Sequence, residues 1–202
     1  MRNRMAASDR SVTERERKNI AISTRIAQEG IVLLENKGVL PLHKDVKTIA
    51  LFGSGARRTV KGGTGSGDVN TRGYVTVEQG LKNAGFQIVT DAWLSGQETA
   101  MLRAKKEYDD HIQELSHRGI SAALLTIMGN PFKEPEFRAI QQEELAPADA
   151  AIYVLARSSG EGADRKVIPG DYLLTDTERR DMELLAKTYD RFVLLLNVGG
   201  VV

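Results

Sequence analysis

Short apolar runs alternate along the chain with segments in which apolar residues recur at helical spacing. The runs "KTIALFG", "FQIVT", "DAAIYVLA" and "RFVLLLNVGG" predict strands at 47–53, 86–90, 149–156 and 191–200. Helices are expected at 11–36, 76–85, 98–119 and 175–190, whereas "ISAALLTIMG", 120–129, fits a helix or a strand. This alternation predicts an α/β sandwich: a mainly parallel sheet with helices on both faces.

The length of 202 residues suits one sizeable domain. We assign residues 1–16 to a polar lead and residues 17–202 to the domain. Because the chain stops at "NVGGVV", where such a domain normally continues into a further helix, we expect the sheet to be incomplete before its last elements. Uncovered apolar surface would then favour self-association as a homo-oligomer.

The composition excludes several classes of function. Lys and Arg total 28 and Asp and Glu total 27, so nothing favours binding to nucleic acid or to an anionic membrane. There is no cysteine, and no apolar stretch approaches the roughly 18 residues of a membrane span. The N-terminus has no signal-like apolar region, which favours a cytoplasmic location. His43, His111 and His117 share no motif spacing, so neither a metal nor a cofactor is expected.

Two glycine-rich loops follow predicted strands, at the sheet edge where open α/β sheets bind ligands. In "GSGARR", Arg58 occupies the third glycine position of a dinucleotide-binding loop. "GGTGSG" lacks the lysine and hydroxyl residue of a P-loop. A nucleotide-binding α/β protein is therefore the weaker hypothesis, and loops that only connect elements are an alternative for each segment.

The second loop, "SSGEGADR", presents Glu161 between two glycines directly after a strand. The small neighbours would allow a ligand to approach closely, and a carboxyl group in a partly enclosed cleft can have the raised pKa that a general acid needs. A solvated loop glutamate is the alternative. Arg165 and Asp164 could pair to fix the loop.

Several blocks, in order, resemble the α/β sandwich domain of glycoside hydrolase family 3, the β-glucosidase family. They are "AQEGIVLLENKGVLPL", "KTIALFGSGARRTVKGGTGSGDVN", "SSGEGADRKVIPGDYLLTDTE" and "VLLLNVGGVV". The resemblance implies hydrolysis of terminal β-linked sugars by a retaining mechanism with two carboxylates. Matching the SGEG block places the general acid/base on Glu161, and matching TGSG makes Ser66 a sugar-binding candidate.

Lys61, Asp68 and Arg58 are further substrate-binding candidates, although Asp68 could instead tie down its own loop. The family implies an aspartate nucleophile on a (β/α)8 barrel domain, and 202 residues cannot hold a barrel of about 250 residues beside this domain. We therefore expect the nucleophile to lie outside this sequence and the fragment alone to be inactive. The alternative is a non-catalytic carbohydrate-binding or interaction module of the same fold.

Overall fold

The computed structural model describes residues 11–63, 71, 73–130, 132, 134–158 and 165–199. The chain divides into two compact units, Met1–Leu40 and Pro41–Val202. The sheet and the glycine-rich loops belong to the second unit.

The first unit contains helix α1, Glu14–Glu29. The Thr13 hydroxyl accepts a hydrogen bond from the Glu16 backbone N–H, and the Glu16 carboxylate accepts one from the Thr13 N–H, a reciprocal capping box. The predicted continuation of this helix to Asn36 is wrong. The helix ends at Gly30, because glycine is a poor helix former and the following Ile31 and Val32 are β-branched.

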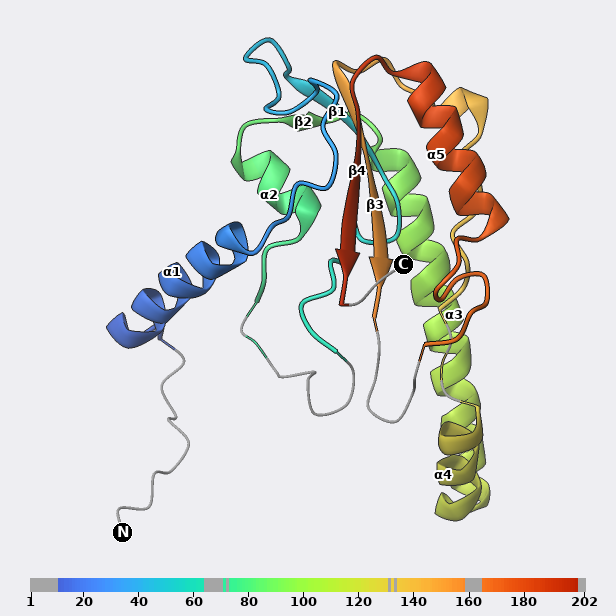
Figure 1. Cartoon of the computed structure of the whole chain (residues 1–202). Helices are drawn as coiled ribbons and strands as arrows, with labels where there is room; N and C mark the ends of the chain where they lie inside the picture. Colours follow the sequence, from blue (N-terminus) through green and yellow to red (C-terminus); the bar gives the residue numbers. More distant parts are fainter. Residues whose placement is uncertain are drawn as a thin grey trace. The chain divides into compact units, whose positions relative to one another are not determined.

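The second unit is built on a four-stranded sheet in the order β2-β1-β3-β4, with every pair parallel (Figure 1). The strands are β1 Thr48–Phe52, β2 Gln87–Ile88, β3 Ala150–Arg157 and β4 Phe192–Val198. Strand β2 is shorter than predicted because the Thr90 side chain replaces a main-chain partner. Its hydroxyl accepts from the Leu51 N–H at 2.9 Å and donates to the Leu51 carbonyl at 2.7 Å.

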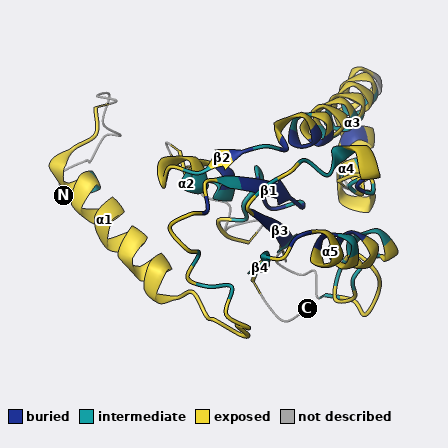
Figure 2. Ribbon diagram, turned by 90° about the horizontal axis from the view of Figure 1, so that it is seen from above, coloured by how far each residue is buried: buried dark blue, intermediate teal, exposed yellow. Residues whose placement is uncertain are grey.

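Helices lie on both faces of this sheet, as the sequence predicts. Helix α2, Val77–Asn83, covers one face, and α3, Asp91–Arg118, and α5, Asp176–Thr188, cover the other (Figure 2). Helix α4, Ile120–Gly129, packs against α3, and a 3-10 turn, η2, spans Gln142–Glu144. The ambiguous segment 120–129 is thus helical.

The core lies between the sheet and the α3/α5 layer. Strands β1 and β3 are buried almost throughout, as expected for central parallel strands covered on both sides. The Trp93 ring on α3 meets Phe52 edge to face, with 5.1 Å between ring centroids, and Leu185 on α5 is fully buried. These contacts fix the sheet beneath the loops at its carboxyl edge.

Helix α4 exposes much of its apolar surface. Leu125 is 71% exposed and Met128 is 82% exposed, and Ala123 is the one residue that is buried among the described residues of this helix. Among the described helices, none combines the length and the apolar character that crossing a bilayer requires. Exposed apolar side chains grouped on one helix favour association in water.

We therefore expect the isolated chain to self-associate, and the double substitution Leu125→Lys/Met128→Lys to reduce that association. Sedimentation velocity over a concentration series measures it. Ser121→Lys, at an exposed polar position of the same helix, is the matched control. A chain that stays monomeric at high concentration, or an equal effect of the control, would contradict this expectation.

Candidate functional site

The turn after β1 lies directly against the end of β3. The Gly55 N–H donates to the Val154 carbonyl at 3.1 Å, and the Ala156 N–H donates to the Ser54 hydroxyl at 3.2 Å. These bonds join the stems of the two glycine-rich segments that the sequence singles out. The two loops therefore start from one place at the carboxyl edge of the sheet, the edge where open α/β sheets generally bind their ligands.

Two glycines make this close approach possible. A Cβ atom on Gly53 would lie 2.4 Å from the Val154 carbonyl oxygen, and one on Gly55 would lie 2.6 Å from a Val154 methyl carbon. Gly53 also has a φ of +94°, a conformation that side chains rarely tolerate. The first two glycines of "GSGARR" thus allow the turn after β1 to pack closely against β3.

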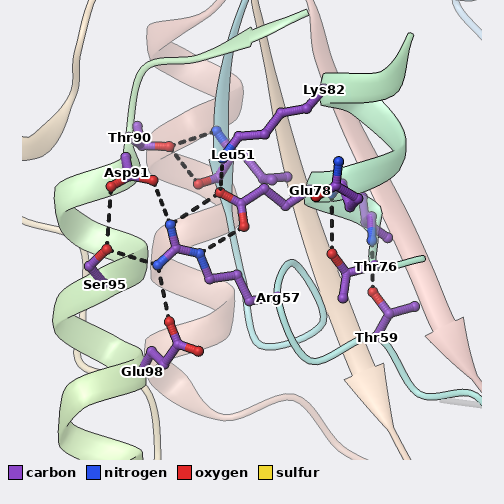
Figure 3. A network of polar contacts seen from close by, with 12 residues as sticks. Leu51, Arg57, Thr59, Thr76, Glu78, Lys82, Thr90, Asp91, Ser95 and Glu98 are labelled. Carbon is purple, nitrogen blue, oxygen red and sulfur yellow. Dashed lines mark hydrogen bonds and ion pairs between the residues drawn. The ribbon is translucent and has the colours of Figure 1, made fainter. Parts of the chain in front are cut away.

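Arg57, in the same turn, is the centre of an ion-pair network (Figure 3). Its guanidinium donates two hydrogen bonds to Glu78 on α2, at 2.8 and 3.1 Å, and one to Asp91 at the start of α3 at 2.6 Å. Further bonds reach Ser95 and Glu98 on α3. One side chain therefore links helices on opposite faces of the sheet to the base of the loop.

Burial of Glu78 by itself would raise the pKa of its carboxyl group. Hydrogen bonds and charge from Arg57 and Lys82 outweigh burial and lower that pKa below its usual value. The side chains of Arg57 and Glu78 are only 17% and 11% exposed. Loss of Arg57 would leave the nearly buried Glu78 carboxylate with Lys82 alone. Loss of Glu78 would leave Arg57 with the more exposed Asp91 and Glu98.

The segment that leaves this turn, Thr59 and Val60, is held by two further sets of hydrogen bonds. The Thr59 hydroxyl donates to the Gly55 carbonyl and accepts from the Val77 N–H, both at 2.8 Å. The Asn197 side chain, at the end of β4, accepts from the Val60 N–H at 2.5 Å and donates to the Val60 carbonyl at 3.1 Å. The loop is therefore anchored up to Val60 before it reaches Lys61.

Arg157, the last residue of β3, forms the stem of the second loop. Its guanidinium makes a two-pronged pair with Glu178 on α5, at 2.7 and 2.5 Å, and the side chains are 8% and 13% exposed. Glu178 also accepts from the Thr175 N–H, which completes the N-terminal capping box of α5. The end of β3 and the start of α5 are thus locked together.

Arg165 lies on the far side of the second loop and pairs with Asp171. Its Nε donates to the Asp171 carboxylate at 2.9 Å, and the Lys166 N–H donates to the other carboxylate oxygen at 2.6 Å. These donors, the Lys166 N–H first, hold the pKa of Asp171 below its usual value. The Asp164 partner expected for Arg165 lies outside the described residues.

The structure gives the described site candidates separate partners. Arg58 forms an ion pair with Glu134, and the Lys61 ammonium lies 5.8 Å from the ring centroid of Tyr74. Ser66, Asp68 and Glu161 lie outside the described residues. Their roles remain predictions.

Sequence reasoning missed the polar groups that hold these loops. Glu78, Glu178 and Asn197 lie 21 or more positions from the arginine or loop residue that they contact, and Asp171 lies six positions from Arg165. No local pattern assigns these contacts. The one available signal for Glu178 is the "TDTE" capping box, and it predicts only its backbone bond. The ion pair with Arg157 depends on the tertiary fold.

The fold and its loop edge define an α/β domain with candidate ligand-binding loops at one edge of a parallel sheet. A family model described as "Glycosyl hydrolase family 3 C-terminal domain" matches residues 31–202. The chain therefore belongs to the C-terminal domain family of glycosyl hydrolase family 3.

Relatives agree with this membership. Beta-glucosidase A of Butyrivibrio fibrisolvens is 31% identical over 92% of this chain, and a beta-glucosidase of Ruminococcus albus is 30% identical over 89%. The structure of beta-glucosidase 3B from Thermotoga neapolitana in complex with alpha-D-glucose aligns with 94% of this chain at 28% identity and a TM-score of 0.67. The chain spans 23%, 18% and 25% of the lengths of these three proteins.

The Arg57 network leads to a stability prediction. Arg57→Met keeps the apolar stem but leaves Glu78 nearly buried without its main partner, and we expect the free energy of unfolding to fall by about 3 kcal/mol at neutral pH. Urea denaturation of the chain followed by circular dichroism measures the change.

Arg103→Met is the matched control, since Arg103 and Glu107 form a pair that is 82% and 65% exposed. Its expected cost is at most about 0.5 kcal/mol. A carboxyl group whose pKa is lower in the folded than in the unfolded protein stabilises the fold at pH values above its unfolded pKa. The contribution of Glu78 to the free energy of unfolding is therefore present at neutral pH and is lost as the pH falls below about 4. Equal losses for both variants, or a difference between wild type and Arg57→Met that does not shrink as the pH falls below about 4, would contradict this account.

Proposed function

We propose that this chain supplies the general acid/base of a retaining β-glycosidase whose active site is completed by a (β/α)8 barrel domain of the same full-length protein. The observation that carries the proposal is the joining of the two loop stems at Gly55–Val154 and Ser54–Ala156, in a chain of this family. This arrangement starts the proposed sugar-binding loop and the proposed acid/base loop from one point.

The proposed chemistry uses Glu161 twice. In the first step a carboxylate from the barrel attacks the anomeric carbon, the glycosidic C–O bond breaks, and the Glu161 carboxyl group gives its proton to the departing oxygen. In the second step water attacks the anomeric carbon, Glu161 takes the water proton, and the barrel carboxylate is released. The substrate class proposed is a β-glucoside, because the relatives are named as beta-glucosidases.

The first glycine-rich loop would bind the sugar. We assign Ser66 as a hydrogen-bonding residue and Lys61, Asp68 and Arg58 as further contacts. In the structure Arg58 is engaged by Glu134, so a role in binding requires it to exchange that carboxylate for sugar hydroxyls. The anchoring of the loop up to Val60 supports a fixed approach to the sugar.

The acid/base assignment predicts a specific loss and rescue. In the full-length protein, Glu161→Gly should lower kcat on a poor-leaving-group aryl β-glucoside by about 100-fold or more. Added azide should partly restore turnover on a dinitrophenyl glucoside, since its glycosyl-enzyme forms without acid assistance and azide attacks it without a general base. Steady-state kinetics with analysis for glycosyl azide measure both effects.

Glu136→Gly is the matched control, because Glu136 is an exposed loop glutamate in the described part of the chain. The control should leave kcat within about twofold, in keeping with a solvated side chain. Full activity of Glu161→Gly would remove the assignment, as would a loss that azide does not relieve at all.

The isolated chain provides a separate test of the missing half of the site. Residues 1–202 alone should release no nitrophenol from nitrophenyl β-glucoside, while the full-length protein does, because attack at the anomeric carbon needs the barrel carboxylate. Turnover by the purified chain, insensitive to Glu161→Gly, would contradict a shared active site.

A further inference from the structure

Two arginines flank the proposed acid/base loop at equal distances along the sequence. Three residues separate Arg157 from Glu161, and three separate Glu161 from Arg165. The loop therefore has one arginine on each stem, with the proposed acid at its centre.

Both arginines donate to the same atom. Arg157 Nε reaches the Asp171 carbonyl oxygen at 3.0 Å, and Arg165 Nη2 reaches it at 2.6 Å. The two stems are therefore fixed to one point, which sets the separation between them. Two guanidinium groups that meet at one oxygen would repel each other unless carboxylates compensated their charges.

Two carboxylates provide that compensation. Glu178 pairs with Arg157, and the Asp171 carboxylate pairs with Arg165. Among the described residues, these four charges sum to zero, and the Arg157–Glu178 pair is nearly buried. Without the Asp171 carboxylate the cluster would carry a net positive charge, and Arg165 would lose the partner that holds its Nε.

The residue at the centre of this cluster is itself held by a compact turn. The Asp171 N–H donates to the Ile168 carbonyl at 3.2 Å, and the Tyr172 N–H donates to the Lys166 carbonyl at 3.2 Å. Gly170 has a φ of +84°, which allows the chain to reverse just before Asp171. The turn thus presents both the carbonyl and the carboxylate of Asp171 to the loop stems.

We propose that Asp171 is a positioning residue for the reaction: it clasps the two stems of the 158–164 loop and so sets the placement of Glu161. This inference rests on the proposed function. It assigns to Asp171 no contact with substrate, and its effect on the reaction passes through Arg157 and Arg165.

The test compares Asp171→Ala with Asp190→Ala in the full-length protein. Asp190 is exposed, and its side chain makes no hydrogen bond or ion pair with the described residues, so it is a matched control. For each protein, kcat/KM is measured on a methylumbelliferyl β-glucoside and on a 2,4-dinitrophenyl β-glucoside. Proton transfer helps the first, more basic leaving group to depart, whereas the second departs without it.

A misplaced acid should lower kcat/KM of Asp171→Ala on the methylumbelliferyl substrate by about tenfold to a hundredfold. On the dinitrophenyl substrate the loss should be less than about threefold, because proton transfer contributes little to that step. A smaller fraction of folded protein would lower both values by the same factor. The ratio of the two therefore separates positioning from stability, and Asp190→Ala should leave both unchanged.

Limited trypsin digestion provides a readout that does not depend on activity. Cleavage after Arg157, Arg165 or Lys166 should be faster in Asp171→Ala than in wild type or Asp190→Ala. If Asp171→Ala matches the wild type both in its cleavage rate and in its ratio of kcat/KM values on the two substrates, Asp171 does not position the loop, and the proposed function stays intact. An inactive wild-type protein would overturn both, whereas faster cleavage with an unchanged substrate ratio would reduce Asp171 to a structural role.

Discussion

The contact between the turn after β1 and the last residues of β3 is the constraint on which the rest of the site depends. Parallel pairing of Ile49–Phe52 with Ala150–Tyr153 brings the two strand ends together, and the main-chain bond from Gly55 to Val154 extends that pairing into the turn. Only residues without a Cβ fit there. Both loops thus start from a fixed position, whatever their own length and composition.

Charged side chains extend this rigidity outward from the main chain. Arg57 ties the first loop to helices on both faces of the sheet, and Arg157 and Arg165 tie the stems of the second loop to α5 and to Asp171. In each case an arginine donates to several acceptors at once, which suits its planar, multiply donating group. The arginines of these networks are shielded from water, and the pairs Arg57–Glu78 and Arg157–Glu178 are nearly buried, so loss of either partner of those two pairs is costly.

The sequence predicted the parts of this structure that depend on local patterns. Apolar runs located the four strands, and apolar residues at helical spacing located α1 and α5, whose starts in the structure are capped by Thr13 and Thr175. The helix beyond Gly30 and the length of β2 were misjudged, since Ile31–Leu34 have the apolar character of a helix face and Thr90 substitutes its hydroxyl for strand pairing. The anchors Glu78, Glu178 and Asn197 could not be predicted, because each acts on a segment that only the tertiary fold brings near. Family resemblance supplied the role of Glu161, which residue patterns alone left open.

In the proposed active site, Glu161 works opposite a carboxylate supplied by the barrel domain. A crystal structure of the full-length protein, with the glycosyl-enzyme trapped by a 2-fluoro sugar, tests it most directly. The account predicts that the trapped carboxylate comes from outside residues 1–202 and that the Glu161 carboxyl group lies about 5 to 5.5 Å from it, the separation of a retaining pair. A trapped residue within this chain, or Glu161 turned away from the sugar, would contradict it.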